Sequence, residues 1–230
     1  MNDPLPHDSS PRVVITGAAH GVGRACALEF ARLGVDLVLC DHDGPALRQI
    51  ASSTRGLARF CDIASEASVD ILAAELLATL PRINVLINAA GSGYVRSLGV
   101  MRVSRALIPA IKRAAGQKLI ANIAPDLGLG HSGNLFAYAG SDGAFARLSE
   151  AIALQTRGSS IQTATVVSGV GSARLAQHWQ QDDSVAATIL LEEIEPRMIA
   201  ASVADLAVDC LAPISGQVDE ATPARQARGL

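Results

Sequence analysis

Short apolar runs alternate with helical patterns along most of the chain. The apolar runs are rich in Val, Ile and Leu and are too short for helices, so they predict buried parallel strands. These predicted strands cover 12–16, 35–40, 57–60, 83–87, 119–123 and 161–167. Helical periodicity fills the intervals, at 22–33, from about Pro45, and at 65–80, 98–115 and 138–156. Such alternation predicts an α/β fold built on a Rossmann-type, doubly wound parallel sheet.

A length of 230 residues, 49% of them hydrophobic, suits a single domain of this kind. We expect the domain to cover 12–218, between a flexible N-terminal tail at 1–11 and a C-terminal tail at 219–230. The part after residue 168 is predicted to be mainly helical, most clearly at 200–211. Pro109 lies inside the predicted 98–115 helix, where it would introduce a kink.

Charge and cysteine usage narrow the possible partners. The formal net charge is −3 and no run of Lys or Arg occurs, which argues against nucleic acid and acidic membranes as partners. No apolar stretch is long enough to span a bilayer, and residues 1–11 lack a signal core. Four widely spaced cysteines form no C-x-x-C pair or metal-ligand pattern. We therefore expect a reduced, cytoplasmic protein that acts on a small molecule.

A glycine-rich segment joins the first predicted strand to the first predicted helix. In a parallel sheet this loop lies at the carboxyl end of the strand, with the helix N-terminus directed at any bound group. Glycines permit the tight turn and the close approach of a diphosphate to the backbone. The residues expected to contact a dinucleotide here are Thr16, Gly17, His20, Gly21, Val22 and Gly23.

Asp41 follows the second predicted strand, near the position where an acid binds the adenosine ribose hydroxyls of a dinucleotide. A carboxylate there would repel a 2′-phosphate, and neither His20 nor His42 replaces the usual arginine. A solvated loop acid is the alternative interpretation. The pattern favours NAD, with NADP less suited.

These motifs, in this order, resemble the short-chain dehydrogenase/reductase family over nearly the whole chain. The first matching motif is the Thr-Gly-x-x-x-Gly-x-Gly loop at 16–23, and the second is the acid Asp41. A third segment, which contains Asp62 and Ile63, is similar to the one in which the family's Asp contacts adenine. A further stretch resembles the family's Asn-Asn-Ala-Gly motif and reads Asn88, Ala89, Ala90, Gly91. The resemblance implies hydride transfer between a nicotinamide and an alcohol or ketone.

The resemblance also implies an Asn, Ser, Tyr and Lys tetrad, which this chain departs from. Tyr138 aligns with the catalytic tyrosine, but Pro125 occupies the serine position and Asp142 the lysine position. Since i and i+4 share a helix face, a carboxylate would replace the ammonium beside the phenol and make it harder to ionise. His131 and Asp126 could supply acid/base chemistry instead, or be surface residues.

Two functions therefore stay open. One is a divergent NAD-dependent oxidoreductase acting on an alcohol or ketone with rearranged catalytic groups. The other is a non-catalytic NAD-binding protein that acts as a sensor or partner subunit. The chain is also shorter than its relatives between Gly91 and Gly99, in a region that the resemblance places at a dimer interface, so assembly as a homo-oligomer is open too.

Overall fold

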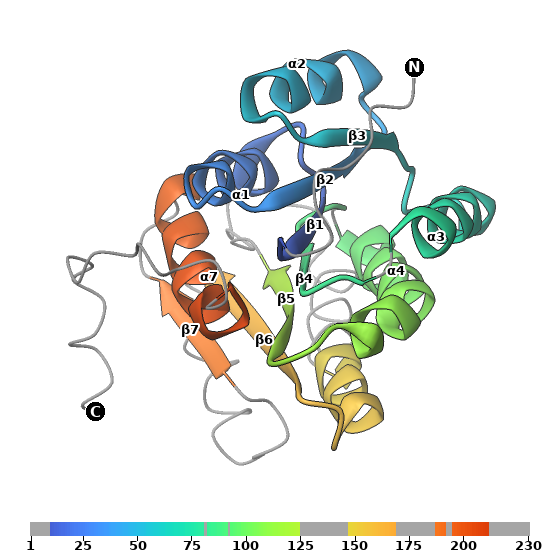
Figure 1. Ribbon diagram of the computed structural model, residues 1–230, viewed down its shortest axis with the longest axis vertical. Coiled ribbons are helices and arrows are strands. Elements are labelled where there is room, and N and C mark those ends of the chain that lie inside the picture. The colour runs from blue at the N-terminus through green and yellow to red at the C-terminus, as the bar shows by residue number, and fades with distance from the viewer. Residues whose placement is uncertain are drawn as a thin grey trace, which may run out of the picture.

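The computed structural model describes residues 10–80, 82–91, 93–124, 147–168, 187–191 and 195–211, and shows seven strands in one parallel sheet (Figure 1). The strand order is β3-β2-β1-β4-β5-β6-β7. The strands are β1 (Arg12–Thr16), β2 (Asp36–Asp41), β3 (Leu57–Phe60), β4 (Val85–Asn88), β5 (Lys118–Ala124), β6 (Ile161–Ser168) and β7 (Ala187–Leu191). This architecture confirms the predicted doubly wound Rossmann-type α/β fold.

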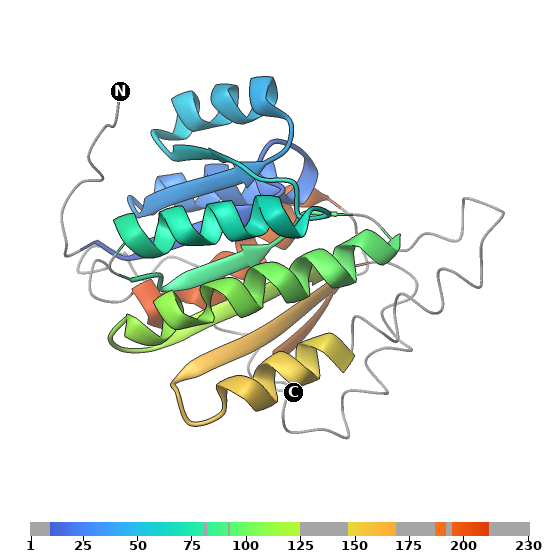
Figure 2. The same ribbon diagram turned by 90° about the vertical axis from the view of Figure 1, so that its right-hand side faces the viewer.

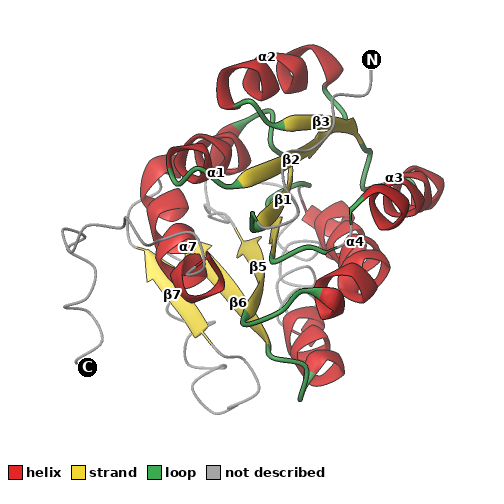
Figure 3. Cartoon of the chain, in the orientation of Figure 1, coloured by secondary structure: helices red, strands yellow, loops and turns green. Residues whose placement is uncertain are grey.

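Helices cover both faces of the sheet (Figure 3). The helices are α1 (Gly21–Arg32), α2 (Gly44–Thr54), α3 (Glu66–Thr79), α4 (Gly93–Arg113), one over 147–156, and α7 (Pro196–Leu211). On one face α1, α2 and α7 pack against the sheet, and on the other α3, α4 and the 147–156 helix do so. Figure 2 looks onto the second face, where α3, α4 and the yellow 147–156 helix run alongside one another.

Alternation along the strands divides the core between the two faces. Val13 and Ile15 of β1 belong to the cluster under α1 and α7, whereas Val14 belongs to the cluster under α3 and α4. All three side chains are fully buried, as expected for a central strand of a parallel sheet. The apolar runs seen in the sequence are therefore two interleaved sets of core residues.

The strand order reverses at β1, which pairs with β2 on one side and with β4 on the other. The connections from β1 and β4 consequently leave the sheet toward opposite faces. In open α/β sheets, a crevice forms outside the carboxyl ends of the strands at such a reversal, and ligands bind there. The loops after β1 and β4 are the ones that carry the predicted site residues.

The segment after residue 168 was expected to be mainly helical, and this is wrong for β7. Residues 187–191 pair with β6 as a parallel edge strand, whereas α7, the other element described after residue 168, is helical as expected. A five-residue apolar run cannot be assigned to strand or helix by periodicity alone. Of the predicted 138–156 helix, 147–156 is helical and 138–146 lies outside the described residues.

Candidate functional site: a pocket at the carboxyl edge of the sheet

A pocket of about 520 Å³ lies at the carboxyl edge of the sheet, where the loops after β1, β2, β3 and β4 meet. Most of the residues predicted to bind a cofactor line it. These are Gly17, His20, Gly21, Val22, Asp41, Asp62, Ile63, Ala89, Ala90 and Gly91. Four separate loops thus bring together pocket residues from Gly17 to Gly91.

The loop between β1 and α1 is closed so tightly that two of its positions leave no room for a Cβ. A Cβ on Gly23 would lie 2.0 Å from the carbonyl oxygen of Gly17, and one on Gly17 would lie 2.7 Å from the Ala90 backbone. Gly21 differs, because its φ is +49° and nothing lies within 4 Å of a Cβ there. The backbone therefore forms a cradle that is open at Gly21.

The N-terminus of α1 faces this pocket without a side-chain cap. His20 is the N-cap residue, and its side chain makes no capping hydrogen bond. By contrast, α2 is capped by Asp43 and α3 by Ser65. The first N–H groups of a helix have no partner within the helix, and with the helix dipole they attract an anion. The glycine loop and the uncapped helix start fit the diphosphate of a dinucleotide.

Asp41 ends β2 and is 6% exposed at the pocket wall. Its Oδ2 accepts a hydrogen bond from the Ala19 N–H at 3.0 Å, and its Oδ1 accepts one from the Asp43 N–H at 3.0 Å. Each carboxylate oxygen can accept more than one hydrogen bond. The carboxylate can therefore hold the loops in place and still accept hydrogen bonds from ribose hydroxyls.

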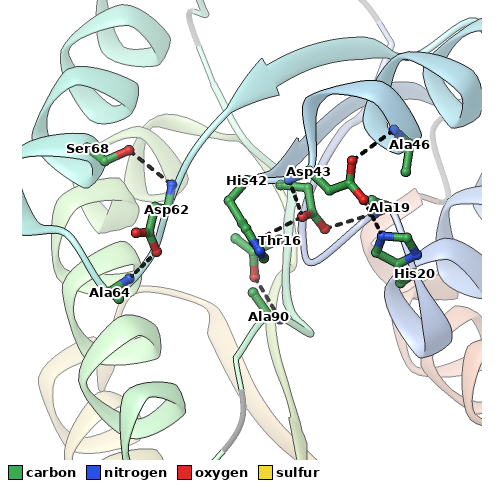
Figure 4. Close-up of polar contacts among 11 residues, drawn as sticks. Thr16, Ala19, His20, His42, Asp43, Ala46, Asp62, Ala64, Ser68 and Ala90 are labelled. Atoms are coloured by element: carbon green, nitrogen blue, oxygen red, sulfur yellow. Dashed lines mark hydrogen bonds and ion pairs between the residues drawn. The ribbon is translucent and has the colours of Figure 1, made fainter.

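Two histidines lie beside the carboxylates at this end of the pocket (Figure 4). The His20 Nε2 is 2.8 Å from Asp43 Oδ2, and the His42 Nδ1 is 3.3 Å from Asp41 Oδ1. The hydrogen bond from the Ala46 N–H and, next, the contact with His20 lower the pKa of the Asp43 carboxyl. Sequence reasoning placed His20 at the site, whereas His42 was set aside because it is not an arginine.

Asp62 and Ile63 form the opposite wall, after β3. Asp62 accepts a hydrogen bond from the Ala64 N–H at 2.9 Å, and its own N–H donates to the Ser68 hydroxyl at 3.0 Å. Ile63 is buried against α4 at Gly99, where a Cβ would lie 2.4 Å from Ile63 Cδ1. This wall is therefore held by contacts with α3 and α4.

Three of the predicted cofactor contacts lie behind the pocket wall: Thr16, Gly23 and Asn88. The Thr16 hydroxyl accepts a hydrogen bond from the Ala90 N–H at 3.3 Å, which ties the β4 loop to β1. Asn88 donates to Asn122 Oδ1 at 2.9 Å and to the Ser104 hydroxyl at 3.1 Å. These residues shape the pocket from beneath.

The pocket also contains residues that the sequence analysis did not predict. Ile123 comes from β5, and Pro196 and Ile199 come from the start of α7. Pro196 at a first helical position was a visible signal for a helix start, but nothing in the sequence tied that start to the site. The catalytic candidates Tyr138, Pro125 and Asp142 lie outside the described residues.

Comparison with known proteins agrees with this geometry. The family model described as short chain dehydrogenase matches residues 11–184. Meso-2,3-butanediol dehydrogenase from Serratia marcescens is 30% identical over 227 residues, covering 89% of this chain and 90% of that protein. The chain belongs to the short-chain dehydrogenase family, whose members are oxidoreductases that bind a nicotinamide cofactor.

Solved structures show the same fold. A metagenomic short-chain oxidoreductase in complex with NADP has a TM-score of 0.65 and 26% identity, covering 86% of this chain and 90% of that one. A Brucella melitensis structure titled ribose-5-phosphate isomerase has a TM-score of 0.67 at 24% identity, with 86% of each chain covered, and supports the fold alone.

In the described segments, no helix is both long and apolar enough to cross a membrane. Within those same residues, no three His, Cys, Asp or Glu side chains gather as a metal site.

Proposed function

We propose that the pocket binds NAD in preference to NADP, and that the chain is an oxidoreductase acting on an alcohol or a ketone. The observation that carries this proposal is the buried Asp41 carboxylate beside the uncapped start of α1. A ribose hydroxyl can donate to a carboxylate, whereas a 2′-phosphate at the same place is repelled by it.

Different residues of the pocket would bind different parts of the cofactor. The N–H groups at Gly21 and Val22 would hold the diphosphate at the positive end of α1. Asp41 would accept from the adenosine ribose hydroxyls, and the wall formed by Asp62 and Ile63 would hold adenine. When bound, a nicotinamide supplies or accepts a hydride.

The ends of β4 and β5 supply the apolar part of the site. Ala89 and Ala90 line the pocket beside Ile123, which is 1% exposed. Such a wall keeps water away from a reacting carbon and strengthens electrostatic interactions at it. The substrate class follows from the family, and the butanediol dehydrogenase relative makes a small vicinal diol the first compound to test.

The acid/base step is expected to differ from that of the family. Tyr138 aligns with the family's tyrosine, but Pro125 cannot donate a hydrogen bond from its side chain. On the predicted helix, a carboxylate at Asp142, four positions after Tyr138, would oppose ionisation of the phenol. The test is NAD reduction with a panel of small alcohols and diols, and NADH oxidation with the matching ketones. Turnover that disappears in Tyr138→Phe supports the proposal, and tight NAD binding without turnover on the whole panel contradicts the catalytic part.

The replacements at Pro125 and Asp142 favour a second candidate, a non-catalytic NAD-binding sensor or partner subunit. Replacement of two catalytic positions is expected in a protein that no longer needs to catalyse a reaction. In that case the double change Pro125→Ser and Asp142→Lys restores no dehydrogenase activity, because the substrate pocket has also diverged. A clear gain of activity in this double variant would count against the second candidate.

Calorimetric titration with NAD and with NADP tests the binding proposal directly. NAD should bind at least about tenfold more tightly, as expected for one unfavourable contact between a phosphate and a partly screened carboxylate. Equal affinity for the two nucleotides would contradict the proposal that Asp41 makes the pocket prefer NAD over NADP.

A further inference from the structure

Two imidazoles and two carboxylates meet at the ribose end of the pocket. His20 is 2.8 Å from Asp43, and His42 is 3.3 Å from Asp41 (Figure 4). Both histidines and Asp41 line the pocket. The contact between His20 and Asp43 crosses from the loop after β1 to the loop after β2, and the Asp43 N–H donates to Asp41. The four groups therefore form one cluster around the place where NAD and NADP would differ.

The members of this cluster differ sharply in exposure. The Asp41 side chain is 5% exposed and is held in one orientation by the N–H groups of Ala19 and Asp43. The His20 and His42 side chains are 66% and 75% exposed. Solvent can therefore reach both rings.

We propose that His20 and His42 set the choice between NAD and NADP through their protonation, with NADP increasingly accepted as the pH falls. This inference rests on the proposed function of the pocket. When both rings are neutral, Asp41 and Asp43 leave the cluster with two negative charges, which repel a 2′-phosphate. When both rings are protonated, the negative charge is cancelled and two charged N–H donors stand where the phosphate would lie.

Other charged groups near the cluster do not change over the same range. Asp62 lines the opposite wall of the pocket and is a carboxylate, not an imidazole. Arg48 of α2 is exposed, with its Nη1 beside Gly44, and Arg24 of α1 is exposed as well. Arginine stays protonated throughout, so these side chains contribute equally at each pH. Imidazole is the side chain whose charge changes between about pH 5 and 8.

The test measures the ratio of the dissociation constants for NADP and NAD by calorimetry at about pH 6 and about pH 8.5, at constant ionic strength. Using the ratio cancels any effect of His20 on the diphosphate, which both nucleotides share. In the wild-type protein the ratio should fall about tenfold from the higher to the lower pH, a modest value because the rings are exposed and screened.

The matched variants keep a neutral hydrogen-bond donor at each contact. His20→Gln places an amide near the Nε2 position and His42→Asn near the Nδ1 position, while neither can be protonated. In the double variant the ratio should fall by no more than about twofold, because the only remaining change is that the 2′-phosphate loses charge near pH 6 and is then repelled less by the carboxylates. Each single variant should retain part of the fall.

The outcomes separate the two proposals. If the wild-type protein binds NAD at neither pH, the proposed function fails. If it binds NAD but the ratio does not change with pH, or if the double variant shows the same fall as the wild type, the role of the two histidines is wrong and NAD binding is untouched.

Discussion

The Asp41 carboxylate accepts a hydrogen bond from the Ala19 N–H at 3.0 Å, across 22 positions of the sequence. This bond joins the end of β2 to the glycine loop that precedes α1. The residue that would select the cofactor's ribose therefore also fixes the loop that would hold its diphosphate. Binding specificity and loop geometry depend on one side chain.

Two substitutions at Asp41 separate these roles. Asp41→Asn keeps one oxygen acceptor and removes the charge, so the preference for NAD over NADP should drop by about tenfold while the fold is retained. Asp41→Ala also leaves the Ala19 and Asp43 N–H groups without an acceptor, which should lower the free energy of unfolding by about 2–3 kcal/mol. Calorimetry and urea denaturation measure the two effects, and an unchanged nucleotide preference in Asp41→Asn would contradict the first.

Gly23 and Gly21 provide a matched pair in the same loop. In Gly23→Ala the new Cβ meets the Gly17 carbonyl oxygen at 2.0 Å, so the loop must open and the protein should fail to fold or lose several kcal/mol of stability. In Gly21→Ala there is room, and only the left-handed φ of +49° opposes the change, at about 1–2 kcal/mol.

Thermal unfolding of the two variants, followed by NAD titration of the stable one, checks this expectation. Gly21→Ala should fold and bind NAD more weakly, because its Cβ projects into the open part of the cradle. Similar melting temperatures for the two variants would show that the contact between Gly23 and Gly17 does not limit the loop.

We expect Asn88 to stabilise the folded protein and not to contact the cofactor. It donates to Asn122 and to Ser104, and its register partners on β1 and β5 are Thr16 and Asn122, so polar side chains cross the sheet just below the pocket. Asn88→Ala leaves two buried acceptors without their donor and should cost about 2–3 kcal/mol. Asn122→Ala is the matched variant, since it breaks the shared bond from the other side.

The double variant of Asn88 and Asn122 tests whether these residues form one network. Because both single changes remove the same bond, the double change should cost less than the sum of the two. Strict additivity would show that Asn88 and Asn122 do not act as one network. A large loss of NAD affinity in Asn88→Ala with unchanged stability would instead place Asn88 in direct contact with the cofactor.

Much of the fold and of the nucleotide pocket follows from local sequence patterns. The glycine spacing, Asp41 and the segments at Asp62 and Asn88 could be placed because each follows a strand, and parallel strands end at one edge. What the sequence could not show is which of these side chains face the pocket. Thr16 and Asn88 face the core instead, since the direction of a side chain depends on the pleat at the strand end.

Sequence patterns also could not predict which residues of distant elements reach the pocket. Pro196 and Ile199 reach the pocket from α7, and their position depends on how that helix packs against α1 and the sheet. The edge strand β7 was missed because a short apolar run is compatible with either helix or strand. Packing between elements far apart in the chain decides both cases.

The buried thiol of Cys26 is expected to make the stability of the protein fall at alkaline pH. Burial, followed by the charge of Glu29, raises the pKa of Cys26 to about 12, against a partly opposing hydrogen bond from its own backbone. An unfolded thiol ionises near pH 8.5. Between about pH 8.5 and the folded-state pKa of about 12, the thiol therefore stays neutral in the folded state and ionises in the unfolded state. Its contribution to stability is complete below about pH 8.5 and is lost as the pH rises above that value.

Urea denaturation of the wild-type protein and Cys26→Ala between about pH 8 and pH 10 measures this contribution. The free energy of unfolding of the wild type should decline more steeply, by up to about 1.4 kcal/mol per pH unit for one thiol. Comparing slopes removes the small packing loss of the substitution itself. Parallel slopes would show that Cys26 ionises equally in both states.

The most direct test of the account is a crystal structure of the protein with bound NAD. We predict diphosphate oxygens within hydrogen-bonding distance of the N–H groups at Gly21 and Val22, and adenosine ribose hydroxyls on the Asp41 carboxylate. A complex in which NAD lies away from the start of α1, or in which the chain's own atoms fill the cradle at Gly21, would contradict it.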